Sequence, residues 1–269
     1  MSGWSLVMSS ARRSKMLAFT MAGLLGLFQF LLCLVARTAE DSNAFGQLVS
    51  LVPDFLRQLL GPSLIAMMSF SGIVCIGYFH IAVMGALIGF VISMGTEPAG
   101  EIELGFVDLV MSRPIPRHWL VTRSAILILG WTGLLLCSMV LGSTVGLLCF
   151  ARQDQLIHSL KMIRSLVPNL AALMGCWGGL SLAVASFSRR RSIAGALVGI
   201  FALSTYLFDY IARVWQPAAG AAGFFPFHYY SGLSLITHVG IPWRDTGILC
   251  GYAIFGTLAA YAQIERRDL

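Results

Sequence analysis

The sequence contains few charged residues. Only 11% of its 269 residues are Asp, Glu, Lys or Arg, whereas a soluble domain has about 25%. Its mean hydropathy is +0.81, and 57% of its residues are hydrophobic. Because this composition leaves too little polar surface to face water, it excludes a soluble globule, a disordered chain and a nucleic-acid-binding domain. It indicates a protein whose surface faces lipid.

Patterns for metal binding, disulfides and nucleotide binding are also missing. The six cysteines lie within or at the end of apolar stretches, which favours small buried side chains over a disulfide framework. No CxxC or HxxxH spacing suited to zinc occurs. A GxxxxGKS/T phosphate-binding loop is absent as well. We therefore expect this chain to hold no metal and no cofactor, and not to hydrolyse ATP.

Six stretches are long and apolar enough to cross a bilayer, which requires about 20 such residues. The predicted fold class is therefore all-α, a polytopic membrane protein with six transmembrane helices in a single transmembrane domain, residues 1–269. The second stretch is longer than a bilayer needs, and we expect it to tilt or to extend into the cytoplasm. The expected spans are residues 16–36, 64–94, 124–150, 166–187, 192–211 and 247–264.

The distribution of basic residues predicts the orientation. With the N-terminus in the cytoplasm, more Lys and Arg residues fall on the cytoplasmic side than on the other side, and the cluster Arg189–Arg191 is the strongest anchor. The segment 151–165 has the opposite bias. We expect both termini to be cytoplasmic, in an inner membrane of the bacterial type.

Three segments between the spans have patterns typical of membrane surfaces. From Phe45 to Leu60, apolar and polar residues recur at helical spacing, which predicts an amphipathic helix in the outer interface. A weaker version of this pattern runs from Leu156 to Ile163. The segment from Trp215 to Trp243 is rich in aromatic and turn-forming residues, which is typical of a cap, a re-entrant piece or an aromatic belt.

The most polar segment is residues 97–123, between the second and third spans. Pro98 suits the first turn of a helix, and Glu97 and Glu101 lie where the positive end of a helix dipole favours carboxylates. Pro114 prevents the helix from continuing. The sequence therefore predicts a short cytoplasmic helix that ends near residue 112 and is followed by a turn into span three.

This segment resembles the cytoplasmic motif of type-2 ABC transporter permeases, commonly Glu-x-Glu-x-Gly-Thr-x-Glu-x-Leu-Leu-Ser-x-Pro-Val-Ser-Arg. Residues 225–230 are similar to the Pro-Phe-x-Tyr segment of that family, and residues 266–269 resemble its terminal Arg-Arg-Asp-Leu. Phe106 and Pro116 depart from the pattern, where the family often has Thr and Ser. The matching residues are Glu101, Glu103, Gly105, Asp108, Leu109, Ser112, Pro114 and Arg117.

The resemblance implies the membrane subunit of an ATP-driven transporter, and an exporter more than an importer. Two copies, the same or different, would form the pathway, and two separate ATP-binding subunits would supply ATP and Mg. Glu101, Glu103, Gly105 and Asp108 would then belong to a coupling helix, with Arg113, Pro114 and Arg117 in its exit turn. We hypothesise that Gly105 allows close backbone approach and that the carboxylates meet basic residues of the partner.

Three ionisable residues inside or near the spans are further candidates, because such groups are costly in a bilayer. His80 lies near the middle of the second stretch. Asp209 and Arg213 are four residues apart and can pair on one helix face. An ion-gradient-driven transporter is the alternative function, although no Asp or Glu falls in the middle of a span. A membrane enzyme and a non-transporting scaffold also stay open, and the substrate cannot be read from the sequence.

Overall fold

The computed structural model describes residues 3–42, 69–105, 116–213, 215–230, 232 and 240–266. Every regular element within these ranges is a helix, which confirms the predicted all-α class. The amphipathic helix predicted over residues 45–60 lies outside the described residues.

Six helical spans are long and apolar enough to cross a membrane, as predicted. The second span consists of two helices that meet at His80, and shorter helices lie between the spans. The spans are α1 (Gly3–Asp41), α4 (Phe70–Phe79) with α5 (Ile81–Gly95), α8 (Trp119–Phe150), α9 (Gln153–Phe187), α10 (Arg191–Ala212) and α13 (Trp243–Arg266), and the short elements are α6 (Glu97–Glu103), α11 (Gln216–Ala222) and the 3-10 helix η1 (Pro226–Tyr229).

Only Ala151 and Arg152 separate α8 from α9. The backbone N–H of Arg152 donates to Oε1 of Gln155 at 3.1 Å, which caps the start of α9. Residues 156–163, expected as a separate surface segment between the spans, form the first turns of α9. Ile163 faces the bundle and is only 3% exposed, whereas Ile157 is 53% exposed.

The fourth span, α9, is the centre of the bundle. It contacts α4, α5, α8, α10 and α13, and Leu170, Leu173 and Trp177 on it are fully buried. The Trp177 ring packs against Phe201 of α10 and Phe227 of η1, with ring centroids 5.9 and 5.5 Å apart. The aromatic segment after α10 is thus joined to the core through η1.

Glycines allow two pairs of helices to approach closely. A Cβ added at Gly142 of α8 would overlap the backbone of Gly26 on α1, and one added at Gly179 of α9 would overlap the backbone of Ala253 on α13. Small residues at helix interfaces of this kind let backbones pack tightly in a bilayer, where burial of apolar surface gives little drive for association. These contacts determine how α1 and α13 lie on the bundle.

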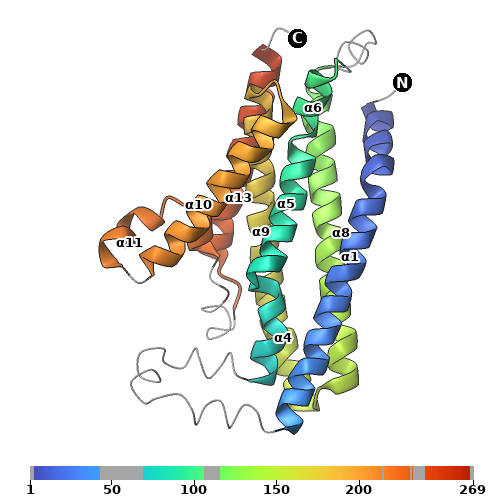
Figure 1. The fold of residues 1–269 in the computed structure, drawn as a ribbon, viewed down its shortest axis with the longest axis vertical. Coiled ribbons are helices and arrows are strands. Elements are labelled where there is room, and N and C mark those ends of the chain that lie inside the picture. The colour runs from blue at the N-terminus through green and yellow to red at the C-terminus, as the bar shows by residue number, and fades with distance from the viewer. Residues whose placement is uncertain are drawn as a thin grey trace.

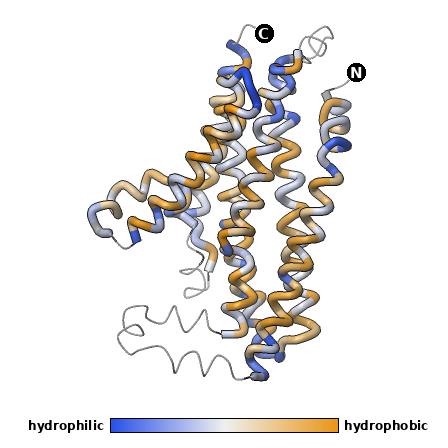
Figure 2. Tube along the Cα trace, in the orientation of Figure 1, coloured by the Kyte–Doolittle hydropathy of each residue, from blue (hydrophilic) through white to orange (hydrophobic). Residues whose placement is uncertain are grey.

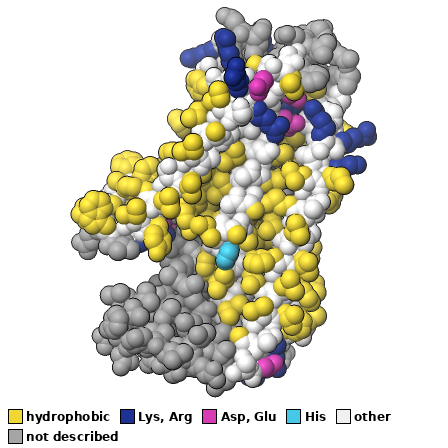
Figure 3. Space-filling view, viewed as in Figure 1, with side chains coloured by type: hydrophobic (Ala, Val, Ile, Leu, Met, Phe, Trp, Pro, Cys, Tyr) yellow, Lys and Arg dark blue, Asp and Glu magenta, His cyan; other side chains and the backbone are white. Residues whose placement is uncertain are grey.

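The outer surface of the bundle is apolar along the middle of its length. Figure 2 shows hydrophobic residues along the helices and hydrophilic residues toward the two ends. Large hydrophobic side chains cover that surface, as Figure 3 shows for one face. Leu24, Leu129, Leu148, Ile200 and Phe255 are each at least 60% exposed. Such a surface suits lipid and not water, so the chain is a multi-pass membrane protein.

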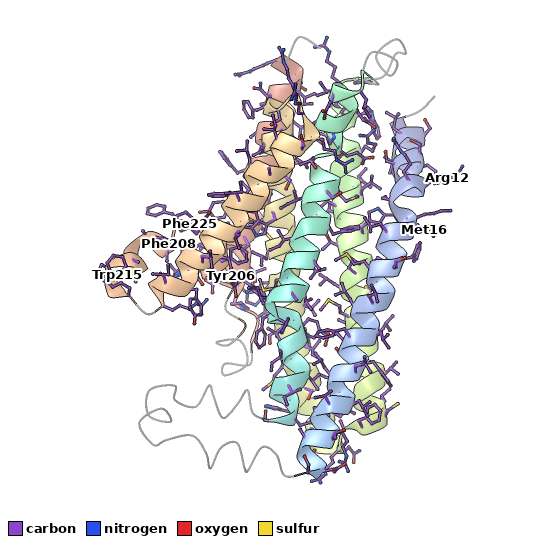
Figure 4. The ribbon with its side chains drawn as sticks, viewed as in Figure 1. Arg12, Met16, Tyr206, Phe208, Trp215 and Phe225 are labelled. Atoms are coloured by element: carbon purple, nitrogen blue, oxygen red, sulfur yellow. The ribbon has the colours of Figure 1, made fainter. Side chains whose placement is uncertain are left out.

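Both termini and α6 lie at the same end of the molecule, which we call the α6 end (Figure 1). The opposite end, where α4 begins, is called the α4 end. Arg12 and Met16 point away from the bundle on α1 (Figure 4). One helical turn separates the charged side chain of Arg12 from that of Met16, an apolar residue that is 79% exposed. The common end of the termini agrees with six crossings.

We expect Gly142→Val to destabilise the protein, because the added side chain separates α1 from α8. Overpacking of this kind costs about 1–3 kcal/mol. The melting temperature of the purified chain in detergent should fall measurably. Gly130→Val is the matched control on the same helix, since a Cβ there meets no atom within 4 Å. Equal melting temperatures for the two variants would contradict the packing described for α1 and α8.

Candidate functional site

The short helix α6 begins directly after α5 and ends at a glycine. Thr96 separates the two helices, and its hydroxyl donates to the Ile92 carbonyl at 2.8 Å. Pro98 occupies the first turn of α6. Gly105 has φ +68°, the left-handed conformation that ends helices and that glycine adopts without strain. The predicted helix end near residue 112 is therefore wrong, because Gly105 stops α6 at Glu103 before the prolines are reached.

Glu101 of α6 forms a buried ion pair with Arg123 of α8. Nη1 of Arg123 donates to Oε1 of Glu101 at 2.9 Å, and Nη2 lies 2.8 Å from Oε2. The Arg123 side chain is only 1% exposed and the Glu101 side chain 10%. Buried charges of this kind are retained in proteins only when they are paired. The pair therefore fixes the middle of α6 against the first turns of α8.

Arg13 of α1 completes this arrangement from the other side. Its Nη2 donates to Oε1 of Glu101 at 3.3 Å and lies 3.9 Å from Oε1 of Glu97. Arg13 is more exposed than Arg123, at 58% of its side chain, so its contribution is smaller. Arg13, Glu101 and Arg123 together are called the Glu101 clamp, which connects α6 to α1 and α8.

Glu103 connects α6 to the start of α10. The backbone N–H of Arg191 donates to Oε2 of Glu103 at 2.9 Å, so a carboxylate satisfies one of the free donors at this helix N-terminus. The guanidinium of Arg191 contacts α5, where it donates to the carbonyl of Ser93 at 2.9 Å. Gly100 provides the space for it, since a Cβ there would lie 2.9 Å from Arg191 Cδ. Through Glu103 and Arg191, α5, α6 and α10 are joined.

The tip of α6 is the part left accessible. Glu103, Leu104 and Gly105 are exposed, and Leu104 is an apolar side chain with 72% exposure. Figure 3 shows basic and acidic side chains at this end of the molecule. α6 thus presents a short exposed tip on a base that is held by ion pairs.

The structure brings together three of the residues predicted for the coupling segment, namely Glu101, Glu103 and Gly105. Arg117 lies in the exposed turn before α8, where its carbonyl accepts the N–H of Leu120 at 3.1 Å. The remaining members of the predicted set, Asp108, Arg113 and Pro114, lie outside the described residues.

Sequence reasoning missed the basic residues that hold α6. Arg13, Arg123 and Arg191 counted only toward orientation, although each pairs with this helix or the helix before it. The signal that could have found Arg123 is its position just before the apolar residues of span three, where a cation needs a partner. The sequence alone does not select its partner, because the polar segment contains Glu97, Glu101, Glu103 and Asp108.

A second polar group lies where α10 ends. Nε and Nη2 of Arg213 donate to Oδ2 of Asp209 at 2.9 and 2.7 Å, as the spacing of these residues predicted. Nδ1 of His228, on η1, lies 3.6 Å from Oδ1 of Asp209. The Asp209 side chain is 8% exposed, whereas those of Arg213 and His228 are each 46% exposed. Figure 1 shows α10 ending about midway along the bundle and not at the α4 end.

His80 marks a break inside the second span that the sequence analysis did not predict. Its backbone is extended, and its Nδ1 accepts the N–H of Ala82 at 3.3 Å. In an unbroken helix that N–H would bond to the carbonyl of Tyr78. The hydroxyl of Tyr230 instead donates to this carbonyl at 2.8 Å. Burial raises the pKa of Tyr230, which keeps its hydroxyl protonated as a donor.

The described residues contain no group of three or more His, Cys, Asp or Glu placed to hold a metal ion. The chain was also compared with family models, with curated proteins and with solved structures, and none of the three comparisons gave a match. The candidate sites therefore stand on their geometry alone.

We expect Glu101→Gln to destabilise the protein strongly, because Arg123 then keeps a buried charge without a carboxylate. Breaking such a pair costs about 3–5 kcal/mol. Unfolding in detergent by increasing denaturant would measure the change. Glu265→Gln, which removes an exposed carboxylate at the end of α13, is the control. If both substitutions had the same small effect, the clamp would not hold α6.

We expect Tyr230→Phe to loosen the break at His80, because the Tyr78 carbonyl loses its donor. A buried acceptor left without a partner costs about 1–3 kcal/mol. Hydrogen exchange followed by mass spectrometry should become faster in the peptide that spans α4 and α5. Tyr210→Phe removes a hydroxyl from a residue that is 66% exposed and should leave exchange in this peptide unchanged. Unaltered exchange in Tyr230→Phe would show that the hydroxyl does not stabilise the break.

Proposed function

We propose that this protein is the membrane-spanning subunit of an ATP-driven transporter of the type-2 ABC kind, working as an exporter in the inner membrane. The six apolar spans are the architecture of a membrane transporter. The observation that favours ATP coupling is α6, which has an exposed tip and a base fixed to the spans by the Glu101 clamp. In this proposal the α6 end faces the cytoplasm, where its basic residues are expected.

The contacts of α6 provide a mechanical route into the membrane. A force on its tip acts on α8 through Arg123, on α1 through Arg13 and on α10 through Glu103. It also acts on α5, because only Thr96 separates α5 from α6. Four of the six spans therefore follow a displacement of α6 as a rigid body, which is how closure of an ATPase pair would move the pathway.

The proposed partners follow from this arrangement. A separate ATP-binding subunit, which would hold the ATP and Mg, docks against the tip of α6, and a second permease copy completes the pathway. Because Glu101 is engaged with Arg13 and Arg123 inside the chain, Glu103 is the carboxylate that we propose to face the partner among the described members of the coupling segment. Leu104 and the turn at Gly105 lie beside it for close contact.

An ion-gradient-driven transporter is the second candidate, and two observations favour it. The second span is broken at His80, and broken helices form ion sites in such transporters. Asp209 is a buried carboxylate at the end of α10, about midway along the bundle (Figure 1). This candidate requires no ATPase partner, so association with one separates the two functions.

The test is to purify the tagged chain together with the ATP-binding protein encoded beside it, and to measure ATP hydrolysis by the complex in lipid nanodiscs. We expect Glu103→Arg to lower the rate about tenfold, which corresponds to about 1.4 kcal/mol, because it places a cation against Arg191 and reverses the charge of the tip. Glu103→Gln keeps an acceptor for the Arg191 N–H and should retain most of the activity.

Glu265→Arg is the matched control, since it makes the same charge change at the same end of the bundle but on α13. Stable association, with a loss of hydrolysis confined to Glu103→Arg, supports the coupling role. If the chain associates with no ATP-binding protein, or if Glu103→Arg and Glu265→Arg behave alike, the proposal fails. The ion-gradient-driven transporter then becomes the better explanation.

A further inference from the structure

Two adjoining cavities lie between α5 and α10. One has a volume of about 290 Å³ and is lined by residues that include Asp209 and Arg213. The other has a volume of about 200 Å³ and continues along both helices toward the α6 end. Met84, Tyr206 and Phe227 line both cavities, so together they form one groove, called the α5–α10 groove.

The half of the groove nearer the α6 end is apolar and is lined in part by glycines. Gly85 and Gly89 of α5 and Gly199 of α10 line it, and a Cβ at any of the three would meet no atom within 4 Å. Ile88 and Ala202 contribute further apolar surface. This half has open space beside its glycines, and its described lining residues carry no charged side chain. Both features suit an alkyl chain.

The other half of the groove ends at the ion pair of Asp209 and Arg213. The carboxylate is the buried member of this group, with 8% side-chain exposure, and the guanidinium already compensates its charge. The side chains of Arg213 and His228 are each 46% exposed beside it. Asp209 and Arg213 both line the cavity, and the guanidinium of Arg213 is the more exposed of the two charged groups, so a ligand that reaches this end meets it first. The end of the groove favours an anionic group.

Aromatic side chains separate the two halves. Tyr206 lies on the bundle side of α10, whereas Trp215 lies at its far end (Figure 4). The Tyr206 ring packs edge-on against Phe227, with centroids 5.3 Å apart. Gly199 and Asp209 are ten residues apart on α10, which is about 15 Å of helix. The groove is thus long enough for a medium-length chain that passes these rings.

We propose that the α5–α10 groove binds an amphiphile with one alkyl chain and a phosphate-type anionic head group. The chain lies over Gly85, Gly89 and Gly199, and the head group meets Arg213 and His228. In this pose the head group points toward the α4 end and the chain toward the α6 end. When the α6 end is cytoplasmic, the head group therefore lies nearer the outer side of the membrane than the chain does. The further step, that this amphiphile is the transported substrate, rests on the function proposed above.

The test is native mass spectrometry of the full chain in detergent, with dodecyl phosphate as the probe. Dodecyltrimethylammonium, which has the same chain and the opposite charge, and inorganic phosphate are the comparison ligands. We expect dodecyl phosphate to bind with a ratio of one per chain, at least about tenfold more tightly than the other two, a difference of about 1.4 kcal/mol. Stronger binding of inorganic phosphate would identify a site for a soluble anion and overturn the proposal.

Two variants test the two halves of the groove. Gly199→Leu fills the apolar half and should reduce binding of dodecyl phosphate about tenfold, equivalent to about 1.4 kcal/mol. Gly195→Leu is the control one helical turn away, since a Cβ there also meets no atom within 4 Å and the residue is outside the described lining of both cavities. Equal binding by both variants would overturn the site.

The double variant Asp209→Asn/Arg213→Gln removes both charges together, so that no buried carboxylate is left without its partner. We expect it to keep chain binding and to lose the preference for dodecyl phosphate over dodecyltrimethylammonium. An unchanged preference would overturn the assignment of the head group. If the wild-type chain is dimeric in detergent and binds no probe, a second copy covers this face and the proposal is overturned.

These measurements need no ATP-binding partner, so they are independent of the coupling experiment. Binding of the probe by a chain that associates with no ATPase would leave the groove intact and end the ABC proposal. Association with an ATPase, without binding of the probe, would support the ABC proposal and overturn the proposed ligand site in the groove. If both hold, dodecyl phosphate should stimulate ATP hydrolysis by the complex, and Gly199→Leu should abolish the stimulation.

Discussion

The ion pair between Glu101 and Arg123 is the constraint that sets the position of α6 on the bundle. Arg123 is almost fully buried at the start of a membrane span, and a cation in that position requires an anion. α6 supplies this anion from a helix of only seven residues. A helix so short has little stability of its own, so its position is set by the clamp, by Glu103 and by the capping residues at its two ends. The position of the exposed tip therefore follows from the contacts that hold the base of α6.

Much of the fold could be predicted from the sequence, because a bilayer limits what an apolar stretch of 20 residues can form. The six spans and the common side of the termini follow from hydropathy and basic residues. Span ends were less accurate. α1 begins at Gly3 instead of residue 16, and α9 at Gln153 instead of residue 166. In both cases polar residues extend the helix beyond the apolar core, where capping and ion pairs such as Arg152 with Glu40 hold them.

The candidate site was only partly predictable for a different reason. Spacing along a helix indicates pairs such as Asp209 and Arg213, because the partners are four residues apart. It says nothing of Arg13 with Glu101, which are 88 residues apart, or of Tyr230 with Tyr78, which are 152 apart. The break at His80 is equally hidden, since neither glycine nor proline occupies it. Tyr230 and the His80 ring satisfy two of the backbone groups that the break frees, the Tyr78 carbonyl and the Ala82 N–H.

The two-residue connection between α8 and α9 has a consequence for how the chain is made. α9 contacts α4, α5 and α8, and these helices all precede it in the sequence. During synthesis α4 and α5 therefore enter the bilayer before their central partner, which follows in the hairpin of α8 and α9. Glu101 is translated before Arg123, so the carboxylate is already present when the arginine emerges. For this pair, the order of residues along the chain means that the buried cation has its partner available when it enters the membrane.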